Sequence, residues 1–427
     1  METSEHQKKN KALLFYGAVF ILALVLRIYR LGDLPYGLHI DEAGMGYDAF
    51  SLAHWGLDRY YKFYPVYFIN FGGGQSVLYG YLCSFLMKFF EPSVILLRVP
   101  AVLSGMITWL FGTMLLRENA GKQAGMTGSL LLAISPCFIL ISRLGLDCFL
   151  FSGMAAASMY CFSRAIKCEQ KKRSLLLYGL TGILWGVSLY TYALSWMVLP
   201  IFLLLALGYL KYVEKISWAE IFCMGVPLGI LAAPLLVFLA INTFDLPEIA
   251  TVHFTIPKLP AYRGAEISLK HVMNNIPLLV QCLFFYDDYR QNSVLTWFSM
   301  YVITIPFILY GMYVQVKTGL AEWKAKTWSV GTLMLLWVAA QICMGLCIEG
   351  PNVNKLNGIY FGLAYFGSIG MKQYLDRIRT VSRRRLFCVG MGAANGSFIV
   401  TFARYYFTQY TGQIIRFLCV GLLMRMF

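Results

Sequence analysis

The chain has 427 residues, of which 59% are hydrophobic and only 13% are charged, and its mean hydropathy is +0.63. Soluble domains carry about 25% charged residues, so this composition excludes an ordinary soluble protein and favours a helical membrane protein. The formal net charge of +15 is the kind of balance that nucleic-acid-binding proteins show. Because cytoplasmic loops of membrane proteins are also rich in Lys and Arg, we expect no nucleic-acid partner.

Apolar runs long enough to cross a bilayer recur from one end of the chain to the other. We predict spans, in chain order, over residues 12–29, 98–116, 124–142, 146–166, 175–192, 194–210, 217–241, 294–316, 327–347, 356–371, 386–402 and a short one from 414. The expected fold is an all-α polytopic bundle of about 11–12 transmembrane helices forming a single domain over residues 1–427. The last apolar segment is short, which predicts a short final helix or a truncated C-terminus.

The placement of basic residues predicts the orientation. If Lys8, Lys9 and Lys11 lie in the cytoplasm, the loops on the same side hold most of the remaining Lys and Arg, as the positive-inside rule requires. The apolar segment 77–90 would reverse this pattern if it crossed the membrane, so we expect it to lie at the outer interface. The predicted protein is a multi-pass plasma-membrane protein with a cytoplasmic N-terminus.

Two long outer loops, over about residues 30–97 and 242–293, follow from this topology, and long loops in compact proteins are usually functional. The first contains His39-Ile40-Asp41-Glu42. Adjacent carboxylates beside a membrane suit proton abstraction from an attacking hydroxyl, with Glu42 orienting Asp41 or helping to hold a divalent metal. A solvated acidic loop end is the structural alternative.

Other residues of the first loop suit sugar recognition. Tyr64 belongs to a group of aromatic residues that either contact sugar faces or form a membrane-interface belt. Gly72-Gly73-Gly74-Gln75 allows a tight turn, which is either a hinge or a ligand-facing turn that presents Gln75. His39 is a candidate substrate-binding residue or metal ligand, although a lone His is more often a hydrogen-bonded structural residue.

Charged residues also lie at the outer ends of predicted spans. Arg98 either extends its guanidinium to the membrane surface or neutralises a lipid phosphate. Arg143 and Asp147 either pair with each other, four residues apart, or serve a site. Asn352, Asn354 and Lys355 cluster before the tenth span, where the amides cap a helix or bind hydroxyls and Lys355 suits a phosphate. In the second loop, Asp287-Asp288 has an unspecific spacing for a metal.

The order of these motifs resembles the GT-C superfamily of membrane glycosyltransferases. The shared features are a first span, an outer loop with Asp-Glu, an interfacial helix, and then LRVPAVLSG, AISPCFILISRLGLD and LWGVSLYTYALSWMVLPIFLL. The chain looks closest to the protein O-mannosyltransferase and aminoarabinose-transferase type, here in a bacterial branch, and NVNKLNGIYF fits that branch. The resemblance covers roughly residues 10–370.

The resemblance implies a family 39-like enzyme that transfers a hexosyl or pentosyl group from a polyprenyl-phosphate donor at the outer face. Asp41 would be the general base and Glu42 the second acidic residue. Arg98 would hold the donor phosphate, with Arg143 and Lys355 as further candidates. His39, Tyr64, Gln75, Asp147, Asn352 and Asn354 are the candidate substrate-binding residues. The expected partners are the bilayer, the lipid-linked sugar and a glycan, lipid or protein acceptor; no cofactor is certain, and a divalent metal is possible.

Two other classes stay open. A transporter or flippase for lipid-linked glycans should show repeats with broken helices and charges near the bilayer midplane, whereas the ionisable residues here gather at the outer ends of spans. The short C-terminal segment also fits an inactive, truncated homologue.

Overall fold

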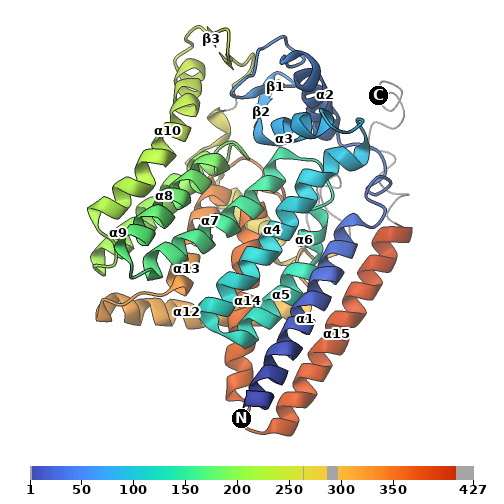
Figure 1. Ribbon diagram of the computed structural model, residues 1–427, viewed down its shortest axis with the longest axis vertical. Helices are drawn as coiled ribbons and strands as arrows, with labels where there is room; N and C mark the ends of the chain where they lie inside the picture. Colours follow the sequence, from blue (N-terminus) through green and yellow to red (C-terminus); the bar gives the residue numbers. More distant parts are fainter. Residues whose placement is uncertain (1, 263, 286–296, 410–427) are drawn as a thin grey trace.

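A computed structural model describes residues 2–262, 264–285 and 297–409 (Figure 1). The predicted span from 414 and the acidic pair Asp287-Asp288 lie outside the described residues. The long helices are α1 (Glu2–Ile28), α4 (Val94–Ala120), α5 (Lys122–Ile134), α7 (Leu150–Lys167), α8 (Lys171–Ser188), α9 (Ser195–Tyr212), α10 (Trp218–Thr243), α12 (Ile305–Ala325), α13 (Val330–Cys347), α14 (Asn357–Arg377) and α15 (Val381–Thr408).

The architecture is the predicted all-α membrane bundle. Within the described ranges, seven helices, α1, α4, α7, α9, α10, α13 and α15, are long and apolar enough to cross a bilayer. Each predicted span that starts before residue 400 overlaps a helix of the structure. The fold class expected from the sequence is therefore confirmed.

One predicted span is interrupted. The segment 124–142 forms α5, which ends at Ile134, and a separate short helix α6 (Pro136–Leu140). Ser135 adopts an extended conformation with ψ 137°, as expected for a residue that precedes a proline. The break leaves carbonyls at the end of α5 without intrahelical partners. Arg27 of α1 donates to two of them, Leu132 O at 2.9 Å and Ala133 O at 3.2 Å.

The second predicted outer loop contains more structure than the sequence indicated. It includes a hairpin of β3 (Ile249–Ala250) and β4 (Thr255–Ile256) and the helix α11 (Val272–Phe284), which packs against α13. Asn275 of α11 donates to three carbonyls at the end of α13, including Ile348 O at 2.6 Å. The predicted span 294–316 begins later, since its helix α12 starts at Ile305.

The first predicted outer loop folds into a cap at one end of the bundle. It comprises α2 (Ile40–Trp55), the strands β1 (Phe68–Asn70) and β2 (Gly73–Gln75), and α3 (Leu78–Met87), which gather at the upper end in Figure 1. Ten residues of α3 rise only about 15 Å, half the bilayer core, in line with the interfacial position predicted for it. Arg59 of the loop donates through Nη2 to Oδ2 of Asp48 in α2 at 2.6 Å, and this contact holds the loop against α2.

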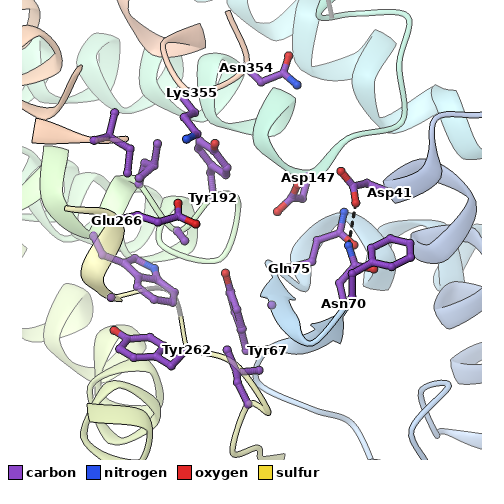
Figure 2. Close-up of a pocket in the computed structure, with 18 of the residues that line it drawn as sticks. Asp41, Tyr67, Asn70, Gln75, Asp147, Tyr192, Tyr262, Glu266, Asn354 and Lys355 are labelled. Carbon is purple, nitrogen blue, oxygen red and sulfur yellow. Dashed lines mark hydrogen bonds between the residues drawn. The ribbon is translucent and has the colours of Figure 1, made fainter. Parts of the chain in front are cut away.

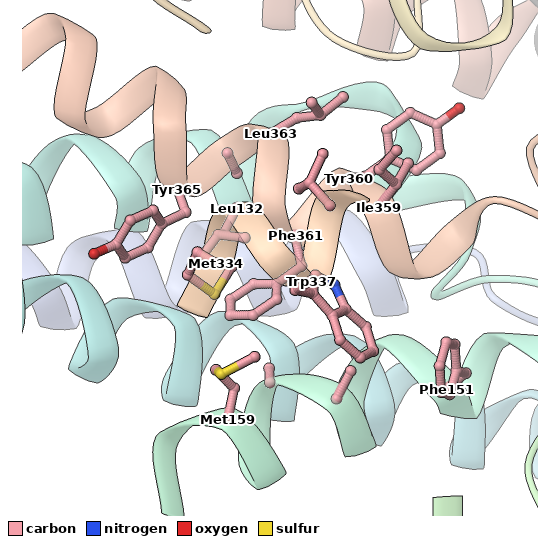
Figure 3. Packing of buried hydrophobic residues seen from close by; sticks show 14 of the residues in the cluster. Leu132, Phe151, Met159, Met334, Trp337, Ile359, Tyr360, Phe361, Leu363 and Tyr365 are labelled. Carbon is pink, nitrogen blue, oxygen red and sulfur yellow. The ribbon is translucent and has the colours of Figure 1, made fainter. Parts of the chain in front are cut away.

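The centre of the bundle is packed by aromatic side chains and by glycines that let helices approach closely. Trp185 of α8 and Trp337 of α13 stack with their ring centroids 5.6 Å apart, and Figure 3 shows Trp337 among side chains from α5, α7 and α14. A Cβ at Gly311 of α12 would lie 1.9 Å from Phe366 O of α14. Small residues at such crossings are typical of membrane helices, because dispersion contacts hold helices together in lipid.

Candidate functional site

A cavity of about 390 Å³ lies between the cap and the bundle, at the ends of α7, α9 and α14 (Figure 2). Its volume falls in the range of about 300–1,000 Å³ that ligand pockets have. The polar residues that line it are His39, Asp41, Tyr67, Asn70, Gln75, Asp147, Tyr192, Tyr262, Glu266, Asn352, Asn354 and Lys355. Seven of the predicted site residues are therefore brought together: His39, Asp41, Gln75, Asp147, Asn352, Asn354 and Lys355.

The start of α2 sets the direction of the acidic pair. His39 is the N-cap, and its Nδ1 accepts the backbone N–H of Asp41 at 3.1 Å. Glu42 completes a capping box by accepting the backbone N–H of His39 at 3.2 Å. These bonds place Asp41 and Glu42 in the first helical turn on different faces.

Glu42 faces the protein interior. Its Oε1 accepts Arg98 Nε at 2.9 Å and the backbone N–H of Gly145 at 2.8 Å, and its Oε2 accepts Arg98 Nη2 at 3.2 Å. The side chains of Glu42 and Arg98 are both 0% exposed. Arg98 also donates to Leu31 O and Gly37 O. The pair therefore joins α2 to α4 and to the chain between α1 and α2.

Asp41 faces the cavity, where its side chain is 38% exposed. Asn70 of β1 donates through Nδ2 to Asp41 Oδ1 at 2.9 Å. His39 Nδ1 lies 3.6 Å from Asp41 Oδ2, but because Nδ1 already accepts an N–H it carries no proton, and the contact is not an ion pair. Asp41 is thus an oriented carboxylate with one oxygen directed to the cavity and no cationic partner among the described side chains.

The glycine-rich segment forms a hairpin rather than a hinge. Phe68, Ile69 and Asn70 pair with Gln75, Gly74 and Gly73, and the turn residues Phe71 and Gly72 have φ values of 48° and 80°. Two successive positive φ values mark the tight turns that favour glycine. The hairpin holds Asn70 and Gln75 against the cavity, which agrees with the ligand-facing alternative.

Asp147 lies beside Asp41 on the same wall of the cavity (Figure 2). Its Oδ2 accepts the backbone N–H of Ser76 at 3.0 Å, so the residue that follows the hairpin holds it in place. Asp147 does not pair with Arg143, although they are four residues apart, because the 3-10 turn η1 (Asp147–Phe149) and the preceding loop replace the expected helix there.

The opposite wall comes from the loop before α14 and from the second outer loop. Figure 2 shows Lys355, Asn354 and Glu266 across the cavity from the two aspartates. Lys355 Nζ donates to Glu349 O, and Asn352 Oδ1 accepts the backbone N–H of Lys355 at 3.0 Å. A cation thus faces two carboxylates across a space large enough for a ligand.

Several buried polar atoms in or directly beside this cavity have no hydrogen-bond partner. Within the described part of the chain, they are His39 Nε2, Asn70 Oδ1, Gln75 Oε1 and Asn354 Oδ1 of the lining, and Ser76 Oγ next to it. Buried polar groups are nearly always hydrogen-bonded in folded proteins. A polar ligand in the cavity would supply partners to the four lining atoms.

Four of the predicted residues do not line the cavity. Glu42 and Arg98 are occupied with each other, so Arg98 neither extends to the membrane surface nor faces the cavity. Arg143, which is 0% exposed, donates to carbonyls at the end of α1, including Arg27 O at 2.8 Å and Tyr29 O at 2.8 Å. Tyr64 packs its ring against Phe63, with centroids 4.8 Å apart.

The described residues do not offer a ready ligand set for a metal ion, since no group of three or more His, Cys, Asp or Glu side chains is close enough among them. Both oxygens of Glu42 are engaged by donors, which removes the second acid from that role. We therefore assign no step to a metal.

Sequence reasoning did not single out Asn70, Tyr192 or Tyr262. Asn70 lies directly before the turn of the glycine hairpin, and this position is the signal that could have found it. Tyr192 follows the end of α8, which stops at Ser188, earlier than the predicted span. Tyr262 lies in the second outer loop, where no periodic pattern guides the choice.

Comparison with known proteins places this geometry in a wider context. Residues 75–238 match the family model described as dolichyl-phosphate-mannose-protein mannosyltransferase. Among curated protein sequences, none matches the chain.

Solved structures share the fold. ArnT from Cupriavidus metallidurans, bound to undecaprenyl phosphate, has a TM-score of 0.56 and a sequence identity of 11%. The match covers 90% of this chain and 64% of the ArnT chain. The oligosaccharyltransferase from Archaeoglobus fulgidus in the apo form has a TM-score of 0.54 and 14% identity, covering 94% and 55%. AglB from the same organism, with an inhibitory peptide and a dolichol-phosphate, has a TM-score of 0.52 and 13% identity, covering 95% and 55%.

The chain spans slightly less than two thirds of the length of the first of these structures and about half of the others. The similarity nevertheless extends over nearly all of this chain, and the family match falls within it. The chain therefore shares the fold of these structures, which agrees with the resemblance seen in the sequence.

Proposed function

We propose that this protein transfers a sugar from a polyprenyl-phosphate donor to an acceptor hydroxyl, with Asp41 as the general base. The observation that carries the proposal is the environment of Asp41. It is a half-exposed carboxylate, oriented by Asn70, in a cavity at the end of a membrane bundle. A general base needs access to the proton that it abstracts, and among the acidic pair only Asp41 has it.

The two walls of the cavity carry the base and the cation that the reaction needs. Asp41 accepts the proton of the acceptor hydroxyl, and the acceptor oxygen attacks the anomeric carbon of the sugar. The bond from that carbon to the phosphate oxygen breaks, and the lipid phosphate leaves with the electron pair. Lys355, across the cavity (Figure 2), is the cation that we assign to the leaving phosphate, because a fixed positive charge stabilises the charge that develops there.

Glu42, Arg98 and Arg143 are positioning residues in this proposal. The buried pair of Glu42 and Arg98 fixes the first turn of α2 and therefore the direction of Asp41. Asn70, Gln75, Asn352 and Asn354 supply amide groups suited to sugar hydroxyls, and the tyrosines Tyr67, Tyr192 and Tyr262 supply rings suited to a sugar face. We assign no role to Tyr64, because its ring packs on Phe63 and it does not line the cavity.

The similar structures support a lipid-linked donor. ArnT is bound to undecaprenyl phosphate, and AglB is in complex with an inhibitory peptide and a dolichol-phosphate. We propose a polyprenyl phosphate of this kind as the donor lipid here, and a glycan, lipid or protein as the acceptor.

We also propose that the cavity lies on the extracytoplasmic side of the plasma membrane. Basic residues of the predicted cytoplasmic loops lie at the far ends of the helices that reach the cavity, for example Arg164 near the end of α7 and Lys372 near the end of α14. This distribution supports a cytoplasmic N-terminus.

The test is transfer by the purified full-length chain in lipid nanodiscs, with radiolabelled polyprenyl-phosphate hexose and aminoarabinose as donors. Wild type is compared with Asp41→Asn and with Asp33→Asn, a matched change at an exposed surface carboxylate. We expect release of sugar by wild type and Asp33→Asn, and a loss of at least about a hundredfold in Asp41→Asn. Equal release by both variants would remove Asp41 from the role of base. Movement of intact donor across the bilayer of sealed proteoliposomes, without release of sugar, would indicate a flippase.

A further inference from the structure

A second polar pocket, of about 380 Å³, lies among the ends of the helices far from the proposed active site. It is formed by the end of α4, the end of α7, one face of α12, the start of α13 and the last turns of α14. The lining residues with polar groups are Asn119, Lys167, Gln315, Thr318, Trp328, Ser329, Tyr365, Lys372 and Gln373.

This pocket is separate from the cavity that contains Asp41. The cavity is lined by Asp147, directly before α7, and by Lys355, directly before α14, whereas this pocket is lined by Lys167 and Lys372 at the other ends of the same two helices. The 18 residues of α7 separate the two by about 27 Å.

The charges around the pocket favour an anion. Lys167 and Lys372 line it, and no carboxylate does. Lys372 Nζ lies 3.9 Å from Oδ2 of Asp376, a long distance for an ion pair, and the side chain of Asp376 is exposed. Glu118 is directed elsewhere, to Tyr160 and Arg164. Two lysines therefore line a concave polar surface that no carboxylate lines, although Glu118 lies near Lys167, and Glu322 accepts the Thr332 hydroxyl beside the start of α13.

The first turn of α13 adds uncharged donors. Ser329 is the N-cap and accepts the N–H of Thr332, while the residues of the first turn that line the pocket are Val330 and Gly331. The first N–H groups of a helix have no intrahelical acceptor, and the helix dipole favours an anion at this end.

Tyr365 provides an independent indication of a ligand. Its side chain is only 2% exposed and lines the pocket, and Figure 3 shows its hydroxyl directed away from the hydrophobic cluster in which the ring lies. Within the ranges that the structure describes, this hydroxyl opens onto the pocket with no hydrogen bond from the protein, and the buried Asn119 Oδ1, on another residue of the lining, has no partner. A buried polar atom without a partner is unusual, and a ligand in the pocket would complete the bonds of both groups.

We propose that this pocket binds a phosphate group, carried either by a phospholipid headgroup or by a soluble phosphate compound. Lys167 and Lys372 neutralise the charge, the start of α13 donates backbone N–H groups, and Tyr365 donates its O–H. Phosphate oxygens accept several hydrogen bonds at once, and lysines together with a helix N-terminus are a common way of holding them.

The experiment uses the purified full-length chain and four forms: wild type, Lys167→Ala/Lys372→Ala, Tyr365→Phe, and the control Lys122→Ala/Lys324→Ala. The control removes two exposed lysines that do not line the pocket, so both double variants lose the same charge. In one arm, phosphatidylglycerol or phosphatidylcholine is titrated into delipidated protein and retained lipid is counted by native mass spectrometry. In the other arm, pyrophosphate is titrated without lipid and binding is measured by calorimetry.

We expect saturable binding of phosphatidylglycerol or of pyrophosphate by wild type and control, and the arm that shows it identifies the source of the phosphate. The Lys167→Ala/Lys372→Ala variant should bind at least about tenfold more weakly, and Tyr365→Phe about fivefold more weakly, since single hydrogen bonds and charge pairs have this size. No saturable binding in either arm, or equal weakening in both double variants, would overturn the proposal. Melting temperatures without ligand report whether each variant is folded.

Discussion

Asp41 and Glu42 are consecutive residues whose carboxylates have opposite environments. The side chain of Asp41 is 38% exposed and accepts a hydrogen bond from Asn70, whereas that of Glu42 is 0% exposed and paired with Arg98. The acidic pair therefore divides into one group that is open to the cavity and one that holds the helix start in place.

This division predicts opposite effects for two neighbouring substitutions. Glu42→Gln leaves the Arg98 guanidinium buried without a counter-charge, which should lower the free energy of unfolding by about 3–5 kcal/mol. Asp41→Asn should change it by less than about 1 kcal/mol, because the site is half exposed, while abolishing sugar transfer. Thermal unfolding in detergent, together with transfer assays, measures both. A stable Glu42→Gln protein would show that the buried pair does not hold α2.

Asn70 orients the proposed base, and its substitutions should separate orientation from folding. Asn70→Ala removes the donor to Asp41 Oδ1 and should reduce turnover by about tenfold or more, since a lost hydrogen bond and a displaced base both slow proton transfer.

Asn70→Asp places a second carboxylate beside Asp41 and disfavours the charged form of the pair. As the pH is lowered, activity of Asn70→Asp should therefore be lost at a higher pH than activity of wild type. The pH–rate profile of donor turnover tests this. Identical profiles for the two proteins would contradict the contact between Asn70 and the base.

The sequence predicted much of this arrangement because its motifs lie at the ends of helices. Once the topology places His39, Gln75, Asp147 and Lys355 on one side of the membrane, short connections bring them to the same end of the bundle. Long apolar runs predicted the helices, because lipid leaves the backbone few alternatives to a helix.

The direction of single side chains could not be predicted in this way. Glu42 turns inward because Arg98, 56 residues later in the chain, and the N–H of Gly145 meet it, and these are contacts between distant segments. Arg143 turns away from Asp147 because the end of α1 offers it several carbonyl oxygens. The break at Ser135-Pro136 was missed by the prediction of one span over residues 124–142, although a proline disfavours helix at the residue before it.

The pair of Asp48 and Arg59 predicts a pH-dependent stability. Asp48 is 0% exposed, and burial raises the pKa of its carboxyl, while the hydrogen bonds and charge of Arg59 act against that rise. Arg59→Met removes the opposing contacts, so the folded-state pKa of Asp48 should rise further above its unfolded value of about 3.9. At neutral pH the variant should lose about 3–5 kcal/mol of unfolding free energy.

The sign of the pH effect follows from linkage. A carboxyl whose pKa is higher in the folded state favours folding when it is protonated, and this contribution is lost as the pH rises through the folded-state pKa. Arg59→Met should therefore be closest to wild type at about pH 4 and fall behind it as the pH increases. Unfolding curves across this range measure the difference, and Lys62→Met, which removes a largely surface pair with Glu248, is the control. A pH-independent deficit would rule out ionisation of Asp48 as its cause.

The proposed orientation can be tested with reporter fusions. A reporter enzyme that is active only outside the cytoplasm should be active when fused after Thr251, in the loop beside the cavity, and inactive when fused after Gln170, between α7 and α8. The basic residues Lys171, Lys172 and Arg173 should retain the second position in the cytoplasm. Activity at Gln170 and none at Thr251 would invert the topology and place the cavity inside.

Arg27 and Arg143 each donate to carbonyls at the end of a helix, which predicts a structural role for Arg143 that can be told apart from phosphate binding. Arg27 of α1 donates to carbonyls at the end of α5, and Arg143 donates to carbonyls at the end of α1. Arg143→Lys keeps the charge but cannot reach these acceptors with one ammonium group, and buried carbonyls left without donors cost about 1–3 kcal/mol each.

We therefore expect Arg143→Lys to lower the unfolding free energy by about 2–4 kcal/mol while the KM for the lipid-phosphate donor stays unchanged in the folded fraction. Lys355→Ala should show the reverse, a higher KM or lower kcat with nearly unchanged stability, because Lys355 lines the cavity. Arg30→Lys, at a side chain that is 45% exposed, is the matched control for the Arg-to-Lys change. A raised donor KM in Arg143→Lys with unchanged stability would instead support binding of the donor phosphate by Arg143.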